Sequence, residues 1–176
     1  MKIKNRLKEA LLAASMGILL ACANCAMADS DPLLKNSSFK EGMETWRVAG
    51  NVKLIPENGP DGGGVLRFSG VPLKTQLISE MLAVEPGKDY VVALWARADS
   101  AGEGGALMRF FDPAQKAIAG TDQRVGLTET NGDWEGLEMK VTVPVGAAYG
   151  MLIIFGGSNG QGHFDASNPK VYPEEN

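Results

Sequence analysis

The feature that most constrains the fold is a long series of short apolar–polar alternations, each ended by Gly or Pro. In residues 90–98, Trp95 and Arg97 fall on the face opposite the Tyr, Val, Leu and Ala of the even positions, because successive strand side chains point to opposite sides. Residues 85–88, Glu-Pro-Gly-Lys, are typical of a type II turn. Many short strands with regularly spaced turns predict an all-β sandwich or barrel, with an opening strand at 33–39.

The first 28 residues have the organisation of an export signal. A basic start precedes an apolar stretch, residues 10–21, that is too short to span a bilayer as a permanent helix. Ala26-Met27-Ala28 favours cleavage after Ala28, which leaves one domain of residues 29–176. Leu19-Leu20-Ala21-Cys22 instead resembles a bacterial lipobox, which would place a lipid on Cys22. We therefore predict a secreted or periplasmic protein, with a lipid anchor to the cell envelope through Cys22 as the alternative.

Cysteine content and charge narrow the possible partners. Cys22 and Cys25 both lie in the export segment, so cleavage after Ala28 leaves no disulfide. Residues 1–28 hold four of the 17 basic and one of the 21 acidic residues, so 13 basic and 20 acidic residues remain, a formal charge of −7. Such a surface repels phosphate backbones and anionic polymers at long range. We expect no nucleic acid partner, and contact with a membrane only through a lipid on Cys22.

Short segments distributed along the chain carry a resemblance to a known family. They are Asn36-Ser37-Ser38-Phe39 with Trp46, Val84-x-Pro86-Gly87-x-x-Tyr90, Trp95-x-Arg97, Phe110-Phe111-Asp112, Trp134 before Val143-Pro144, and Gly162-His163-Phe164-Asp165. In this order and spacing the chain resembles the carbohydrate-binding modules of families four, nine and twenty-two. The resemblance implies a galactose-binding-domain-like jelly-roll β-sandwich, with its first and last strands side by side.

The same resemblance implies non-catalytic binding of a polysaccharide or other glycan. Such sites stack an aromatic ring on the C–H face of a sugar and satisfy its hydroxyl groups with polar side chains, at about 1 kcal/mol net for each hydrogen bond. If the even positions of 90–98 face the core, Trp95 and Arg97 point outward, and Arg109 from a nearby strand would join them. We predict these three residues as the glycan-binding candidates; the alternative is a core Trp95 with a solvated Arg97.

Modules of this kind often hold a structural calcium between the first and last strands. The resemblance places Asp165 at one ligand position, but Lys40 occupies the position of an expected acidic ligand. Calcium requires six to eight oxygen ligands, and an ammonium group opposes it. We therefore predict no metal or other cofactor, with a Lys40–Asp165 ion pair as one replacement for the calcium.

Two other functions compete with glycan binding. A jelly-roll polysaccharide lyase needs a Tyr or His as acid and base, and His163 is the only histidine. A lone histidine is more often a surface or capping residue, so we predict no enzymatic activity, whether as a lyase or as a glycoside hydrolase component. A structural envelope protein that uses the sandwich for protein contacts is the second alternative, which the sequence does not separate from a glycan binder.

Overall fold

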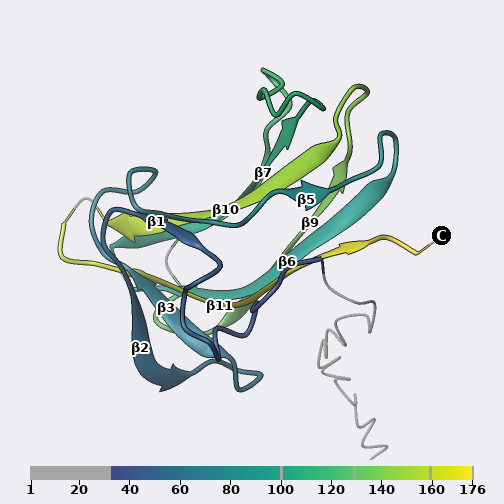
Figure 1. Ribbon diagram of the computed structural model, residues 1–176. Coiled ribbons are helices and arrows are strands. Elements are labelled where there is room, and N and C mark those ends of the chain that lie inside the picture. Colours follow the sequence, from purple (N-terminus) through teal and green to yellow (C-terminus); the bar gives the residue numbers. More distant parts are fainter. Residues whose placement is uncertain (1–32, 100, 129, 159, 176) are drawn as a thin grey trace, which may run out of the picture.

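The structure, a computed structural model, describes residues 33–99, 101–128, 130–158 and 160–175, and all its regular elements are β-strands (Figure 1). The strands are β1 (Arg47–Ala49), β2 (Val52–Asn58), β3 (Gly64–Phe68), β4 (Gln76–Ile78), β5 (Leu82–Ala83), β6 (Asp89–Ala98), β7 (Gly102–Phe111), β8 (Gln123–Thr128), β9 (Glu135–Thr142), β10 (Tyr149–Ser158) and β11 (Phe164–Pro173). Within these ranges no helix is long and apolar enough to cross a membrane. The predicted export segment, with Cys22, lies outside the described residues.

Two antiparallel sheets pack face to face. Sheet A has the order β1-β4-β10-β7-β8, with β5 also paired to β10, and sheet B has the order β2-β3-β11-β6-β9. Figure 1 shows sheet A above sheet B. Because most neighbours within a sheet are distant in sequence, the connections cross repeatedly between the two layers. The predicted jelly-roll sandwich is confirmed.

The core lies between the sheets and is filled by alternate residues of each strand. The buried set includes Leu94 and Ala96 of β6, as the alternation predicted. Phe68 and Phe164 meet edge to face in sheet B with ring centroids 5.8 Å apart. The Phe164 ring reaches across to sheet A, where a Cβ on Gly104 or Gly156 would come within 2.5 Å of it. These two glycines therefore allow the sheets to approach closely at this point.

The opening segment differs from the predicted strand over residues 33–39. It begins alongside the last strand, where the Leu33 N–H donates to the Val171 carbonyl over 2.8 Å, but it then forms turns. Asn36 and Phe39 have positive φ angles of 50° and 55°, which no extended strand adopts. The turns deliver Phe39 and Trp46 into the core, with ring centroids 5.5 Å apart. The motif that opens the chain thus closes one side of the sandwich.

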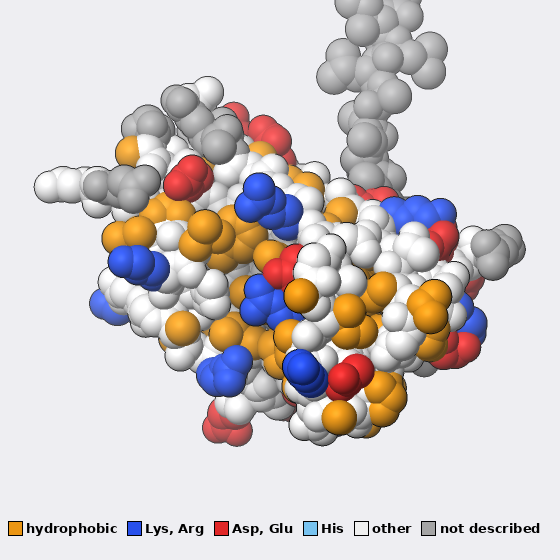
Figure 2. All heavy atoms as spheres, turned by 90° about the horizontal axis from the view of Figure 1, so that it is seen from above, with side chains coloured by type: hydrophobic (Ala, Val, Ile, Leu, Met, Phe, Trp, Pro, Cys, Tyr) orange, Lys and Arg blue, Asp and Glu red, His pale blue; other side chains and the backbone are white. Residues whose placement is uncertain are grey.

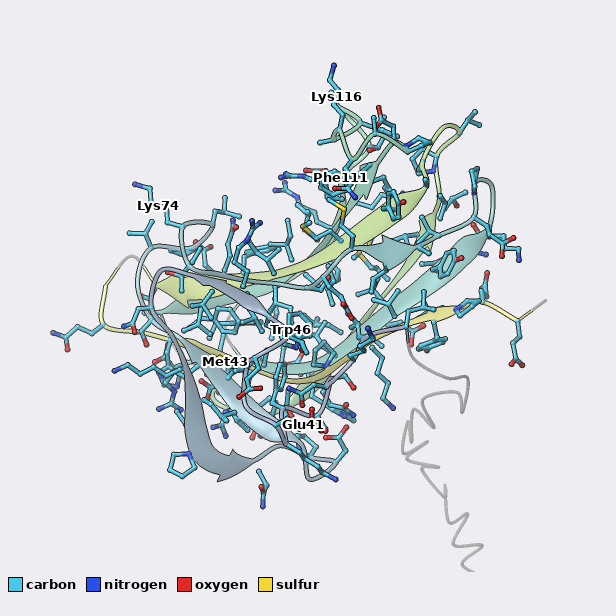
Figure 3. All side chains as sticks on the ribbon, viewed as in Figure 1. Glu41, Met43, Trp46, Lys74, Phe111 and Lys116 are labelled. Carbon is cyan, nitrogen blue, oxygen red and sulfur yellow. The ribbon has the colours of Figure 1, made fainter. Side chains whose placement is uncertain are left out.

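Each sheet has one outer face turned away from the core, and these two faces are the candidate sites. Figure 3 shows Lys74 and Phe111 on the outer side of sheet A, whereas Trp46 lies between the sheets. The loop of residues 70–75 and the loop of residues 112–122 flank the outer face of sheet A, since one leads into β4 and the other joins β7 to β8. Sheet A is therefore an open platform between two loops.

Candidate functional site

A groove of about 340 Å³ lies on the outer face of sheet A. Its lining comes from β7, β8 and β10 and from the loop before β4. The lining residues are Pro72, Leu73, Glu103, Gly104, Arg124, Val125, Gly126, Leu127 and Phe155. Figure 2 looks down on this side of the molecule and shows hydrophobic side chains gathered in clusters, with Lys and Arg side chains set between them.

The strand register explains why the groove is deep at one place. One row of paired residues crosses the sheet from β1 to β8: Ala49, Gln76, Phe155, Gly105 and Gly126. The two glycines leave a depression beside the partly buried Phe155 ring. A Cβ on Gly105 would lie 2.1 Å from the Val125 carbonyl oxygen, whereas one on Gly126 would meet nothing closer than 3.5 Å. Gly105 is thus required by the fold, but Gly126 leaves space that a side chain would fill.

One rim of the groove carries a strained leucine. Leu73 has a φ angle of 66° and a side chain that is 55% exposed. A left-handed backbone is costly for a residue with a bulky side chain, at about 1–3 kcal/mol. The turn is held by two hydrogen bonds, from Lys74 N–H to the Val71 carbonyl over 3.2 Å and from Gln76 Nε2 to the Leu73 carbonyl over 2.6 Å. The turn therefore presents an exposed apolar side chain at a cost to stability.

Arginines lie at both margins of the same face. The row next to the glycines runs from Arg47 through Ile78, Ile153 and Leu107 to Arg124. Arg47 and Arg124 are exposed and have no ion-pair partner among the described residues. Arg109 differs, because its Nη2 lies 2.6 Å from Asp122 Oδ2 and its Nε also donates to that carboxylate. Hydrogen bonding to Asp122 raises the pKa of the Arg109 guanidinium above its ordinary value.

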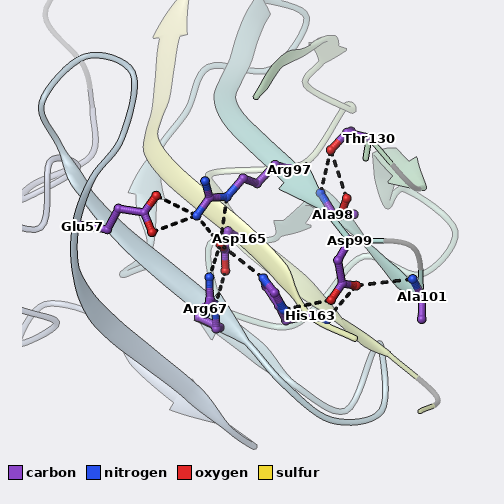
Figure 4. Close-up of polar contacts among 9 residues, drawn as sticks. All are labelled: Glu57, Arg67, Arg97, Ala98, Asp99, Ala101, Thr130, His163 and Asp165. Atoms are coloured by element: carbon purple, nitrogen blue, oxygen red, sulfur yellow. Dashed lines mark hydrogen bonds and ion pairs between the residues drawn. The ribbon is translucent and has the colours of Figure 1, made fainter. Parts of the chain in front are cut away.

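The outer face of sheet B is dominated by an ion-pair network (Figure 4). Arg67, Asp165 and Arg97 occupy one row across β3, β11 and β6. The Asp165 carboxylate is fully buried and accepts two hydrogen bonds of 2.8 Å from Arg67 and one of 3.0 Å from Arg97 Nε. Arg97 Nη2 also donates to Glu57 over 2.9 Å. The hydrogen bonds to Asp165 raise the pKa of Arg67.

Trp95 and Arg97 do point outward from sheet B, so the facing predicted from the alternation is correct. Arg97 is only 18% exposed, lies against two carboxylates, and has its guanidinium carbon 4.6 Å from the centroid of the Trp134 ring. Trp95 is partly buried. The register places it beside Ser167, on which the loop at Gly59 packs so closely that a Cβ there would lie 2.2 Å from Ser167 Oγ. Arg97 is thus enclosed by neighbouring groups of the protein, whereas Trp95 stays partly exposed between Ser167 and Gly136.

Arg109 does not join these two residues, and that part of the prediction is wrong. It lies on β7, which belongs to sheet A, so the whole sandwich separates it from Trp95. Alternation along a strand predicts which side chains share a face of that strand, but it does not say which sheet the strand enters. The structure brings Arg109 instead into the neighbourhood of the groove, on the same face as Arg124.

The predicted replacement of calcium by a Lys40–Asp165 pair is also wrong, because the two arginines bind Asp165 and Lys40 is exposed. Two guanidinium groups against one carboxylate do not provide the oxygen ligands that calcium requires. In the part of the chain that the structure describes, no group of three or more His, Cys, Asp or Glu side chains is placed to hold a metal ion. The residues at this position therefore do not fit the calcium site that the resemblance implied.

His163 lies on the margin of the sheet B network. Its Nδ1 is 3.0 Å from Asp99 Oδ2, and its Nε2 is 3.7 Å from Asp165 Oδ2. Its backbone N–H donates to Asp99 over 3.0 Å. The side chain thus lies between two carboxylates of the protein, on the sheet opposite the groove.

Sequence reasoning missed the residues that form the groove, especially Phe155, Leu73 and Arg124. The run from Tyr149 to Phe155 predicts a central strand, and β10 does lie inside sheet A. Its nearly continuous apolar character gave no alternation to separate the outward Phe155 from the inward Ile154. Leu73 lies in a loop with a left-handed turn, and the residue type at that position does not indicate such a turn. The only available signal was the pair of glycines at 104–105, which is unusual inside a strand.

Comparison with known proteins agrees with this architecture. In a bacteriophage CBA120 protein, the enzymatically active domain of tailspike protein 4 superposes with a TM-score of 0.63 and 18% identity, over 81% of this chain and 21% of that one. The present chain therefore spans about a fifth of that domain. TmCBM61, solved in complex with β-1,4-galactotriose, gives a TM-score of 0.58 at 18% identity, over 82% of this chain and 100% of that one.

A third structure, the CBM22-1 xylan-binding domain of Paenibacillus barcinonensis Xyn10C, gives a TM-score of 0.59 at 14% identity, over 84% of this chain and 97% of that one. At such identities these superpositions show the shared fold. No curated protein sequence matches the chain. The sequence model of the CBM_4_9 family, described as a carbohydrate binding domain, matches residues 31–162, which is most of the chain. The chain therefore belongs to the CBM_4_9 family of carbohydrate binding domains.

Proposed function

We propose that this protein binds a glycan, without cleaving it, in the groove on the outer face of sheet A. The observation that carries the proposal is the composition of the groove. The Phe155 ring and the exposed Leu73 provide apolar surface, while Arg124 and Glu103 provide polar groups within the same 340 Å³. This combination matches a sugar, which has an apolar C–H face and a rim of hydroxyl groups.

The shape of the face supports a polymer rather than a single sugar. Five strands lie side by side at a spacing of about 4.8 Å, so the rows of side chains extend roughly 19 Å from β1 to β8. The outward-facing Met151, Tyr149 and Phe111 extend the apolar surface beyond Phe155. Because one stacking contact contributes only about 0.5–1.5 kcal/mol beyond burial, useful affinity requires several sugar units. Two structural neighbours, one solved with β-1,4-galactotriose and one a xylan-binding domain, are consistent with oligomeric ligands.

The groove supports binding rather than hydrolysis. A glycoside hydrolase needs two carboxyl groups about 5–10 Å apart across the scissile bond. Among the residues that line the groove, Glu103 is the only acid. His163, the candidate acid and base for a lyase, lies on the opposite sheet between Asp99 and Asp165. A non-enzymatic protein is therefore part of the proposal.

Export of the protein is a further part of the proposal, with cleavage after Ala28 or lipid attachment at Cys22. The basic start and the short apolar stretch of the sequence support it. Mass spectrometry of the N-terminus of protein recovered from the native cell distinguishes the three outcomes. A terminus at Asp29 indicates secretion, and a lipidated Cys22 indicates an anchor. An intact Met1 on cytoplasmic protein would overturn export.

The binding proposal is tested with a glycan array followed by titration of the best ligand. Phe155→Ala should lower the affinity at least tenfold, because it removes the ring from the groove. Trp95→Ala is the matched control: it removes an aromatic side chain from the outer face of sheet B, so the affinity should change less than twofold. A loss of binding in Trp95→Ala alone would move the site to sheet B, and an array with no bound glycan would overturn the function itself.

A further inference from the structure

We propose that the ligand is an acidic glycan, one that carries carboxylate groups, and that Arg124 is the residue that selects it. This proposal rests on the groove being the glycan site. The exposed Arg124 lines the groove, and the guanidinium has no ion-pair partner among the described residues. A planar guanidinium binds a carboxylate with two parallel hydrogen bonds, which a hydroxyl group does not reproduce. An unpaired arginine at this place therefore distinguishes acidic from neutral sugars.

The charges around the groove are mostly positive. Arg47 on β1 and Lys74 on the rim loop are exposed, and within the described ranges neither forms an ion pair. Figure 3 shows the Lys74 side chain projecting from the sheet A side. The opposing acid is Glu103, which the register places four residues along β7 from the partner of Arg124, roughly 13 Å away. The groove thus has a cationic end, at Arg124, and a separate acidic end.

A second arginine, Arg109, lies near Arg124 but is paired with Asp122. Asp122 precedes Arg124 by two positions, immediately before β8, and its carboxylate accepts hydrogen bonds from Arg109. The three side chains Arg109, Asp122 and Arg124 together carry one net positive charge. Removal of the Asp122 charge would leave both guanidinium groups available to the ligand.

The negative formal charge of the whole chain does not oppose this inference. Charges on exposed groups are screened beyond about 8 Å at physiological ionic strength. The acidic residues of sheet B, such as Glu57 and Asp165, are neutralised by Arg67 and Arg97 on the far side of the sandwich. The charged groups within one screening length of the groove therefore decide whether an anionic or a cationic ligand is favoured there. An acidic glycan in the groove would be an exception to the long-range repulsion of anionic polymers expected from the net charge.

The test uses matched pairs of polysaccharides. Polygalacturonate, alginate, hyaluronan and glucuronoxylan are arrayed beside the carboxyl-reduced form of each, which keeps the sugars but removes the charge. At least one acidic polymer should bind at least tenfold more tightly than its reduced partner, and its affinity should fall as sodium chloride rises. If the reduced or other neutral glycans bind equally well or better, the acidic-ligand inference is overturned and the proposed function stands. If no glycan binds, the proposed function fails as well.

Variants then assign the selection to Arg124. Arg124→Gln should lower the affinity for the acidic polymer about tenfold or more and the affinity for its reduced partner much less, since charged hydrogen bonds are the stronger ones. Lys53→Gln is the control, because it makes the same charge change on sheet B, where Lys53 is exposed. Asp122→Asn should strengthen acidic binding several-fold. An equal loss in Arg124→Gln and Lys53→Gln, or weaker acidic binding in Asp122→Asn, would overturn the assignment.

Discussion

The two outer faces of the sandwich contain similar residue types but arrange them in opposite ways. On sheet B, Arg67 and Arg97 close on the buried Asp165, and the charged groups satisfy one another. On sheet A, Arg47 and Arg124 stand at the ends of an aliphatic row with no ion-pair partner among the described residues, and two glycines open a groove beside Phe155. Paired charges stabilise a fold, whereas unpaired charges beside an apolar groove are available to a ligand.

The comparison also shows why an outward tryptophan is an incomplete indicator of a binding site. Trp95 faces solvent by strand alternation, yet the neighbouring Arg97 is already paired with Glu57 and Asp165. Phe155 is less conspicuous in the sequence, but it pairs with Gly105, which in turn pairs with Gly126 of the next strand. Because Trp95 also has small neighbours in its register, Ser167 and Gly136, the two faces differ instead in the arginine near each ring, which is ion-paired at Arg97 and without an ion-pair partner among the described residues at Arg124. Variants on both faces test this difference.

The largest effect should come from Asp165→Asn in sheet B. The change removes the buried carboxylate and leaves Arg67 and Arg97 facing each other, so the free energy of unfolding should fall by about 2–3 kcal/mol. Urea denaturation measures it. Asp122→Asn is the control, since it breaks an exposed pair and should cost at most about 1 kcal/mol. Equal losses of unfolding free energy in the two variants would show that the sheet B network stabilises the fold no more than the exposed pair does.

A gain in stability is expected from Leu73→Asn on the rim of the groove. Asn tolerates a left-handed backbone better than Leu, so the free energy of unfolding should rise by about 1 kcal/mol while glycan binding weakens. Thermal melting and ligand titration are measured on the same sample. Val145→Asn, which removes a 92% exposed side chain elsewhere, should alter neither. A loss of stability in Leu73→Asn would mean that the turn is not strained.

The smallest effect concerns the pH dependence of sheet B. Thr142 and Lys140 bind the Asp89 carboxylate and hold its pKa below the ordinary value of 3.8. A lowered folded pKa contributes stability that is complete above 3.8 and is lost as the pH falls through the folded value. Asp89→Asn should therefore melt slightly below the wild type near pH 6, and the difference should shrink toward acid. A difference in melting temperature that grows as the pH falls would contradict the expected direction of this pH dependence.

The sequence was sufficient for the sandwich because alternation and turns are local signals. The buried face of β6 follows from residues close in the chain. The location of the groove depends on long-range register, which places Gly105 of β7 between Phe155 of β10 and Gly126 of β8. The sheet assignment of Arg109 and the pairing of Asp165 with two arginines have the same origin. None of these contacts has a periodic signature within one strand.

The most direct test of the account uses two exposed strand glycines, one on each face. Gly126→Ile fills the groove of sheet A, and Gly136→Ile adds the same side chain beside Trp95 on sheet B; new Cβ atoms would approach existing atoms only to 3.5 Å and 3.7 Å. Both variants should melt near the wild-type temperature, since both glycines are exposed and a Cβ at either makes no close contact. Titration with the glycan identified on the array should show at least a tenfold loss of affinity in Gly126→Ile and less than a twofold change in Gly136→Ile. The reverse pattern would contradict the account and return the site to Trp95 and Arg97.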